Sequence, residues 1–201
     1  MVEIFKSGGW LMWPILVCSV GALAIIVERL WTLQQKNVVP LELTEKVWRW
    51  VRNNQLDERH IKALRDSSPL GQILAAGLAY RARARVVIKE AVEDTGRHVV
   101  HELERYINSL GTIAMISPLL GLLGTVIGMV KVFAAITTHG VGNPSVLAGG
   151  ISEALITTAA GLTVAIPALI GYRYLRGRID ELVVQMEKEA LKLIEAIEGK
   201  A

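Results

Sequence analysis

The chain has 201 residues, of which 52% are hydrophobic and 20% charged, with a mean hydropathy of +0.40. This balance is too apolar for an ordinary soluble domain and too charged for a chain buried wholly in lipid, so it indicates a protein divided between membrane and water. The single Cys18 excludes a disulfide framework within the chain. The net charge of +3 does not indicate nucleic-acid binding, because excess Lys and Arg in a membrane protein more often marks cytoplasmic loops.

The first apolar segment is an uncharged run of 21 residues, 7–27, which is long enough to cross a bilayer as a helix. Trp10 and Trp13 at one end and Trp31 at the other are typical of interfacial anchors. The run exceeds the ~7 to 15 apolar residues of a signal peptide. We therefore predict that residues 1–33 comprise an N-terminal segment and a retained membrane helix.

Two further apolar runs follow later in the chain. Residues 106–130 carry no charge, and residues 147–172 carry one, Glu153. The Gly and Asn-Pro residues of the intervening stretch, "TTHGVGNPSV", are typical of a tight turn. We predict a membrane hairpin, with helices at 106–138 and 147–172 and a loop at 139–146.

The polar segments 34–105 and 173–201 have helical patterns. Pro40, Asp57 and Pro69 stand where helices are expected to begin. From about residue 86 one apolar face leads without a proline into the second span: Ile88, Val92, Val99, Leu103, Ile107. The tail repeats the pattern at Ile179, Leu182, Val183, Met186, Ala190, Leu193 and Ile197. We predict that both membrane helices continue far beyond the bilayer, with Gly96 as a weak point in the first.

The distribution of Lys and Arg predicts the orientation. Thirteen lie in residues 34–109 and six in 173–201, whereas 1–10 has one and 139–147 has none. By the positive-inside rule, the N-terminus and the 139–146 loop face the periplasm, and the other two polar segments are cytoplasmic. The sequence therefore predicts an all-α membrane protein with three transmembrane helices, long cytoplasmic helical extensions, a periplasmic N-terminus and a cytoplasmic C-terminus.

Small residues form one face of each of the last two spans. Close packing of helices in lipid relies on such residues, because lipid supplies no hydrophobic drive for association. In the second span the face is Gly111, Ala114, Pro118, Gly121, Thr125, Gly128, Val132 and Ala135, with Gly124 and Gly128 forming a GxxxG pair. In the third it is Ala154, Thr158, Gly161 and Ala165. Each face suits another helix or a narrow lumen.

Three other patterns predict no site. The stretch "GTVIGMVK" lacks the spacing of a phosphate loop. His98 and His101, flanked by Asp94 and Glu102, lie one turn apart, but a solvated charged face explains them better than a metal site. No nucleophile, base and orienting group stand together. We therefore predict a protein that is not an enzyme and has no cofactor and no metal.

Glu153 is the only acidic residue between Arg105 and Ile179. An acid inside a bilayer is costly, and intramembrane acids commonly serve ion movement. The alternative is an interfacial residue whose carboxylate reaches headgroup water, near Lys131 of the neighbouring span. Thr157 shares its helix face at i+4, whereas Thr158 at i+5 is rotated away by roughly 140°.

Two motifs carry a family resemblance. "SPLLGLLGTVIGMVKVF" and "GGISEALITTAAGLTVAIPALIGY" resemble the paired membrane motifs of the MotA/TolQ/ExbB proton-channel family, most closely its ExbB and TolQ branch. The resemblance covers about residues 102–178. It implies an inner-membrane stator subunit of Gram-negative bacteria. It further implies a homopentamer around a dimer of a single-span ExbD- or TolR-type partner, with proton flow driving an outer-membrane process.

The resemblance also implies roles for single residues. Thr125 and Thr158 are expected to line the lumen beside an aspartate of the partner, with Glu153 near the proton path. Pro118 and Pro167 match family positions at which kinks are expected. The small face of the third span becomes the lumen side, and Thr157 is expected to face a neighbouring subunit. The residues expected to allow close helix packing are Gly121, Gly124, Gly128 and Gly161.

The function implied is coupling of the proton motive force to TonB-dependent transport across the outer membrane. Three alternatives stay open. A TolQ-like subunit would work with a TolA-like transducer in envelope maintenance. A non-conducting scaffold would only assemble partners, and a small secondary transporter is disfavoured because no inverted repeat is visible.

Overall fold

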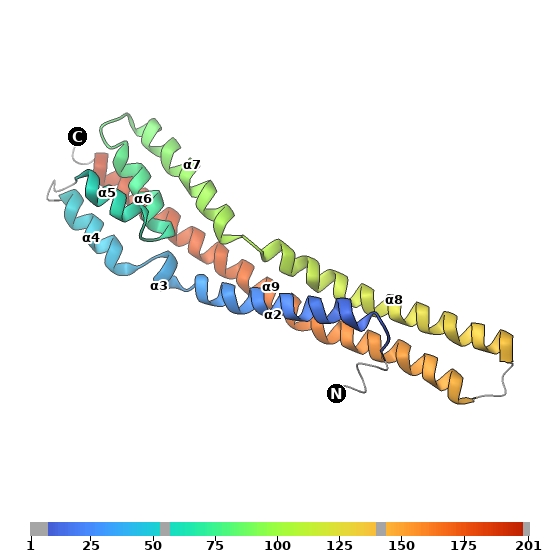
Figure 1. The fold of residues 1–201 in the computed structure, drawn as a ribbon. Coiled ribbons are helices and arrows are strands. Elements are labelled where there is room, and N and C mark those ends of the chain that lie inside the picture. The colour runs from blue at the N-terminus through green and yellow to red at the C-terminus, as the bar shows by residue number, and fades with distance from the viewer. Residues whose placement is uncertain (1–7, 53–56, 140–143, 199–201) are drawn as a thin grey trace. The chain divides into compact units, whose positions relative to one another are not determined.

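The computed structural model describes residues 8–52, 57–139 and 144–198. These residues form helices joined by short connections, and no strand occurs among them (Figure 1). The predicted all-α fold is thus confirmed. The chain divides into two compact units. Met1–Glu28 and Tyr106–Tyr174 form the first, called here the membrane unit, and Arg29–Arg105 and Leu175–Ala201 form the second, the polar unit.

The membrane unit contains most of α2 (Met12–Thr32), all of α8 (Ile107–His139) and the first part of α9 (Pro144–Glu198). Three helices in the described part of the chain are long and apolar enough to cross a membrane, as predicted. α8 and α9 run side by side as an antiparallel hairpin (Figure 1). The turn between them, 140–143, lies outside the described residues, as do the first seven residues.

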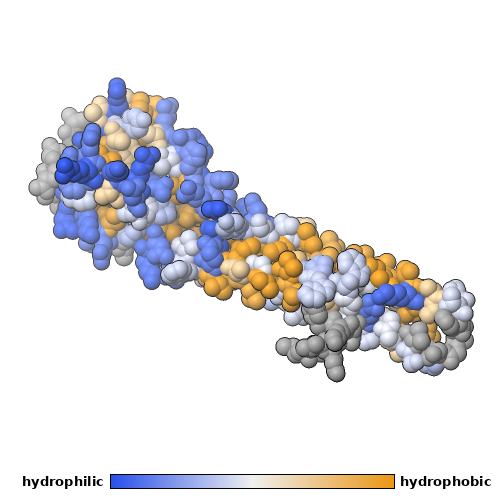
Figure 2. Space-filling view, in the orientation of Figure 1, coloured by the Kyte–Doolittle hydropathy of each residue, from blue (hydrophilic) through white to orange (hydrophobic). Residues whose placement is uncertain are grey.

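α2 lies against both members of the hairpin. Gly21 of α2 lies close to Ile113 of α8, and Gly171 of α9 lies close to Ile26 of α2. The outward faces of all three helices are apolar, and Figure 2 shows hydrophobic surface over them. Trp10, Trp13 and Trp31 are all exposed. Such a surface suits lipid or further helices rather than water.

The polar unit is built from five shorter helices and the end of α9. The helices are α3 (Gln35–Val38), α4 (Leu41–Arg52), α5 (Glu58–Arg65), α6 (Pro69–Ala79) and α7 (Arg85–Leu103). Hydrophilic side chains cover α4 to α7 in Figure 2. α6 is the apolar centre of this unit, because Leu70 and Leu78 are completely buried and Gly77 abuts Val92 of α7 and Leu193 of α9.

The expected helix starts in the polar unit are confirmed. The Asp57 side chain accepts a hydrogen bond from the Glu58 amide at 2.7 Å and begins α5. Pro69 occupies the first turn of α6, where its missing N–H costs nothing, and the Ser68 hydroxyl accepts from the Gly71 amide at 3.1 Å. Pro40 immediately precedes α4.

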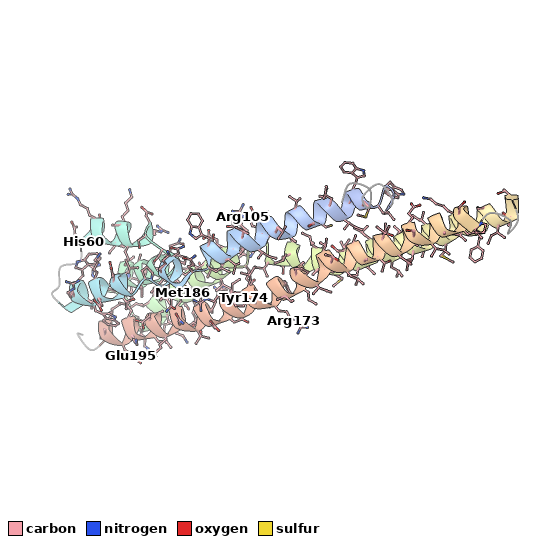
Figure 3. All side chains as sticks on the ribbon, turned by 90° about the horizontal axis from the view of Figure 1, so that it is seen from below. His60, Arg105, Arg173, Tyr174, Met186 and Glu195 are labelled. Carbon is pink, nitrogen blue, oxygen red and sulfur yellow. The ribbon has the colours of Figure 1, made fainter. Side chains whose placement is uncertain are left out.

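The two apolar faces predicted in the polar segments are also found. Those of α7 and the start of α8 are buried at Ile88, Val92, Val99, Leu103 and Ile107. In α9, Val183 and Ile197 are partly exposed and the others are buried. Met186 points into the packed helices of the polar unit, whereas Arg173 in the membrane unit points away from its neighbours (Figure 3).

The predicted continuity of the two long helices holds for only one of them. α9 is unbroken over 55 residues, but α7 ends at Leu103 and α8 begins at Ile107, so the expected single helix across this point is wrong. Tyr106 has a left-handed φ of 65°, which a helix interior does not allow. The Arg29 guanidinium donates to the Glu102 and Leu103 carbonyls, which a continuing helix would use itself. Gly96, the expected weak point, lies within α7 without interrupting it.

The Ser68 cap gives a testable prediction. Ser68→Ala removes the acceptor for the Gly71 amide at a buried helix start, which costs ~1 kcal/mol. We expect the first amides of α6 to exchange hydrogen about fivefold faster, as measured by mass spectrometry of the full chain in detergent. Ser68→Thr keeps a hydroxyl cap and should exchange as the wild type does. Equal exchange in Ser68→Ala would contradict the role of the cap.

Candidate functional site

The centre of the membrane unit is a close contact between the backbones of α8 and α9. A Cβ added at Gly121 would lie 3.0 Å from Thr158 Cα, and one added at Gly161 would lie 2.5 Å from the Ser117 carbonyl oxygen. A Cβ added at Gly128 would lie 2.8 Å from Ala154 Cβ. The two small-residue faces therefore pack against each other, which confirms the expectation that each face contacts another helix.

The threonines of this contact have distinct environments. The Thr158 hydroxyl donates to the Gly121 carbonyl at 2.9 Å and is half-buried. The Thr125 hydroxyl donates to the Leu122 carbonyl at 2.6 Å, and its side chain remains partly exposed. Thr157 is 1% exposed and lies against Gly124, where a side chain would overlap its Oγ1.

Two expectations about these helix faces are wrong. Ala154, Gly161 and Ala165 are buried by their own chain, so they do not line a lumen, and only Thr158 of that face stays partly exposed. Thr157 does not face a neighbouring subunit, because Gly124 of the same chain covers it. Both errors have one cause: a helix face of small residues can serve a lumen or a partner helix, and the hairpin uses it for the partner helix. The GxxxG pair that contains Gly124 was the signal for this contact.

Glu153 makes an ion pair across the hairpin. Its Oε1 lies 2.6 Å from the Lys131 Nζ of α8, and the two side chains are 21% and 51% exposed respectively. The pairing with Lys131, which was held open from the sequence, is confirmed. The ion pair joins α8 to α9 and fixes the position of the Glu153 carboxylate beside Lys131.

The turn that precedes α2 also contacts Glu153, which the sequence did not predict. Gly9 has a left-handed φ of 69°, and a Cβ added to it would overlap Glu153 Oε1. A crevice too narrow for a water molecule lies here, lined by Gly8, Trp10, Leu11, Gly124, Ile127, Glu153 and Thr157. The signal in the sequence was the Gly8-Gly9 pair near the start of the first apolar run, shortly before α2 begins at Met12.

Pro118 and Pro167 both lie inside helices that continue past them. Each lacks an N–H, so the carbonyl one turn earlier loses its helical partner. Pro118 is half-buried beside Ser117, whose carbonyl faces Gly161. Pro167 is exposed on the outer face of α9. That these prolines kink their helices stays a prediction.

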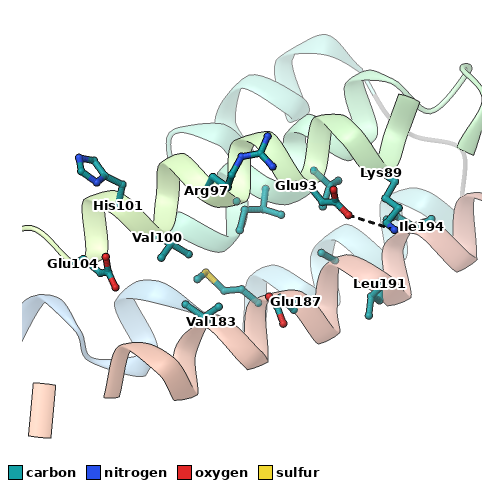
Figure 4. Close-up of a pocket in the computed structure, with 15 residues that line it drawn as sticks. Lys89, Glu93, Arg97, Val100, His101, Glu104, Val183, Glu187, Leu191 and Ile194 are labelled. Carbon is teal, nitrogen blue, oxygen red and sulfur yellow. Dashed lines mark ion pairs between the residues drawn. The ribbon is translucent and has the colours of Figure 1, made fainter. Parts of the chain in front are cut away.

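A groove in the polar unit lies among α6, α7 and α9 and holds about 680 Å³ (Figure 4). Its rim carries the Lys89–Glu93 ion pair, with Nζ and Oε1 3.4 Å apart. His101 lies on the rim and His98 is also exposed. Among the described residues, no three His, Cys, Asp or Glu side chains are placed to hold a metal ion.

The three membrane-capable helices, the glycine-paired hairpin and its single acid define a multi-pass α-helical membrane protein. Residues 65–188 match the MotA/TolQ/ExbB proton channel family. The chain belongs to that family, and the match includes α6 and α7, which the two sequence motifs did not reach.

Relatives similar over most of the chain carry ExbB names. "Putative biopolymer transport protein ExbB-like 1" of Synechocystis is 36% identical over 185 residues, which are 87% of this chain and 70% of the relative. "Biopolymer transport protein exbB1" of Vibrio cholerae is 32% identical, covering 92% of this chain and 83% of the relative. "Tol-Pal system protein TolQ" of Haemophilus influenzae is 40% identical, over 41% of this chain and 36% of the relative.

These similarities and the three membrane-capable helices establish an inner-membrane protein of ExbB/TolQ-type energy transduction. This family works with ExbD/TolR-type and TonB/TolA-type partners.

Proposed function

We propose that the chain is the channel-forming subunit of an ExbB-like stator, which acts with an ExbD-like single-span partner and catalyses no reaction. It couples the proton motive force to TonB-dependent transport across the outer membrane. One observation carries the proposal: the only acid between Arg105 and Ile179 lies on α9, where it pairs with Lys131 of α8 and shares a crevice with Thr157. The ExbB branch is favoured because the ExbB-named relatives match most of the chain.

The proposed assembly is a homopentamer around a dimer of the partner, with the N-terminus and the 139–146 loop in the periplasm and the polar unit in the cytoplasm. The excess of Lys and Arg in the polar segments supports this orientation. The apolar outer faces of α2, α8 and α9 support lipid or neighbouring subunits around each chain. Thr125 and Thr158 are the hydroxyls of the hairpin proposed to face the lumen.

In the proposed mechanism, a proton from the periplasm protonates a carboxylate of the partner inside the lumen. Neutralising that acid lowers its desolvation cost and permits a step of relative motion before the proton is released inward. A membrane potential of 100 mV supplies about 2.3 kcal/mol per proton. The Thr158 hydroxyl donates to the Gly121 carbonyl, so its oxygen can still accept a hydrogen bond from a water or from the protonated acid.

The test measures TonB-dependent uptake by cells that lack their own ExbB-like subunit and express variants of this chain instead. We expect Glu153→Gln and Thr158→Ala to reduce uptake at least tenfold. Thr125→Ala should reduce it by less, because the Thr125 hydroxyl bonds a carbonyl of its own helix whereas the Thr158 hydroxyl bonds Gly121 across the hairpin. Thr112→Ala and Thr163→Ala are matched controls, since their exposed hydroxyls bond only backbone carbonyls of their own helices, Asn108 and Ala159. These two should retain uptake.

Survival of uptake in Glu153→Gln, Thr125→Ala and Thr158→Ala, at normal protein levels, would show that the proton-path role is wrong and favour a scaffold. A TolQ-like function has its own support in the 40% identity to a TolQ protein. Expressing the chain in strains that lack either ExbB or TolQ separates the two, because restored uptake indicates the first function and restored envelope integrity the second.

A further inference from the structure

The turn before α2 lies directly on the Glu153 carboxylate. The Gly9 backbone approaches so closely that any Cβ there would overlap Oε1 and lie 3.1 Å from Cδ. Gly9 also has the left-handed φ that glycine adopts without strain. Two independent features, the backbone conformation and the contact, thus require glycine at this position.

The same carboxylate oxygen carries the ion pair. Lys131 Nζ approaches Oε1 from α8, and the Gly9 backbone approaches it from the turn. A side chain at residue 9 would therefore compete for the space in which Oε1 meets Lys131. The turn and Lys131 together fix the position of Glu153 Oε1.

The turn itself is firmly attached to the membrane unit. The buried side chains of Leu11, Met12 and Ile15 follow it, and the Met12 amide donates to the Gly9 carbonyl at 3.3 Å. The exposed Trp10 ring suits the bilayer interface. The crevice beside Glu153 has no room for water, so the turn closes this side of the acid.

We propose that Gly9 is a positioning residue of the proton path: the turn at residues 8–10 holds Glu153 Oε1 against Lys131 and shields this side of the acid from water. This inference rests on the proposed role of Glu153. It adds that the path is closed on one side by the chain's own N-terminal segment, so proton exchange at Glu153 takes place on the Lys131 side.

A hydrophobic carbodiimide measures this shielding, because it forms a stable N-acylurea only with a carboxyl group that it can reach and that is protonated. Glu153 is the only acid between Arg105 and Ile179, so mass spectrometry of that region reports on it alone. In the full-length protein in membranes, we expect Gly9→Ala to label on the order of tenfold faster than wild type, because the strain at positive φ adds to the overlap. Gly149→Ala is the matched control, since an added Cβ there meets nothing within 4 Å one turn before Glu153.

Two further variants separate the proposal from misfolding. Gly9→Asn tolerates the left-handed φ but still crowds Oε1, so it should label as fast as Gly9→Ala. In Gly8→Ala the nearest atoms to the added Cβ are Cγ and Sδ of the flexible Met12 side chain and the Ile156 methyl group, and not the Glu153 carboxylate, so its labelling should stay near that of the wild type. If Gly9→Ala fails to insert into the membrane, two other variants still test the shielding. Gly9→Asn tolerates the left-handed φ and keeps the overlap, and Glu153→Asp has a shorter side chain that withdraws the carboxylate from the turn.

Coupling between Lys131 and Glu153 provides the second measurement. In wild type, Lys131→Met and Glu153→Gln should have non-additive effects on the midpoint of thermal unfolding, and in the Gly9→Ala background they should become additive. Labelling within twofold of wild type in Gly9→Ala and Gly9→Asn, with the coupling retained, would overturn the proposal. Neither the labelling nor the unfolding measurement depends on transport. A failure of the proposed function would therefore be seen separately, as normal uptake by cells that carry Glu153→Gln.

Discussion

Gly161→Val is expected to remove most of the folded protein from the membrane. A Cβ at this position would lie 2.5 Å from the Ser117 carbonyl oxygen and 3.1 Å from Gly121 Cα, and both atoms belong to the backbone of α8. A backbone cannot rotate away as a side chain can, so the helices must separate along their length. Separation also breaks the hydrogen bond from Thr158 to the Gly121 carbonyl. We expect a loss of about 3 kcal/mol or more.

The measurement is the amount of protein in washed membranes, followed by its thermal unfolding in detergent. Gly149→Val is the matched control on the same helix, because the space around Gly149 is open. It should accumulate normally. A Gly161→Val protein that accumulates and unfolds at the wild-type temperature would show that close approach of α8 and α9 is not required.

The sequence was sufficient to predict most of the helices because their signals are local. Long apolar runs predicted the spans, and Asp57 and Pro69 mark helix starts that depend on neighbouring residues alone. Periodicity likewise predicted the buried faces of α7 and α9. These features depend on residues within about one helical turn of one another.

The break between α7 and α8 could not be predicted in this way. Arg29, more than 70 residues earlier in the chain, donates hydrogen bonds to the last carbonyls of α7, and we expect this contact to end the helix. No Pro or Gly occupies residues 103–107 to mark the break. The burial of Ala154, Gly161 and Ala165 and the contact of Gly9 with Glu153 are likewise properties of tertiary packing. A charged residue at the end of a span, such as Arg29, can anchor the span at the bilayer interface or cap another helix. The neighbouring sequence is the same in both cases, so it does not distinguish them.

Arg29→Met is therefore expected to loosen the end of α7. Arg29 is 4% exposed, and its Nη1 lies 3.3 Å from the Leu103 carbonyl oxygen and 3.5 Å from that of Glu102. A cation at a helix C-terminus also interacts favourably with the helix dipole. Methionine can fill the space of the arginine stem but cannot donate, so these carbonyls lose a charged donor. Hydrogen bonds to charged groups contribute about 1.5 to 3 kcal/mol each at best, and these two are long, so a total near the lower figure is expected.

Hydrogen exchange of the full chain in detergent localises this effect. A loss of 1.4 kcal/mol corresponds to a tenfold increase in local opening, so the last turn of α7 should exchange at least ~10 times faster. Arg97→Met, which removes an exposed arginine of the same helix from its pair with Asp94, should leave exchange nearly unchanged. Arg29→Lys should be intermediate, because a lysine keeps the charge but has no planar fork of donors. Unchanged exchange at the end of α7 in Arg29→Met would mean that Tyr106 and the surrounding packing end the helix without the arginine.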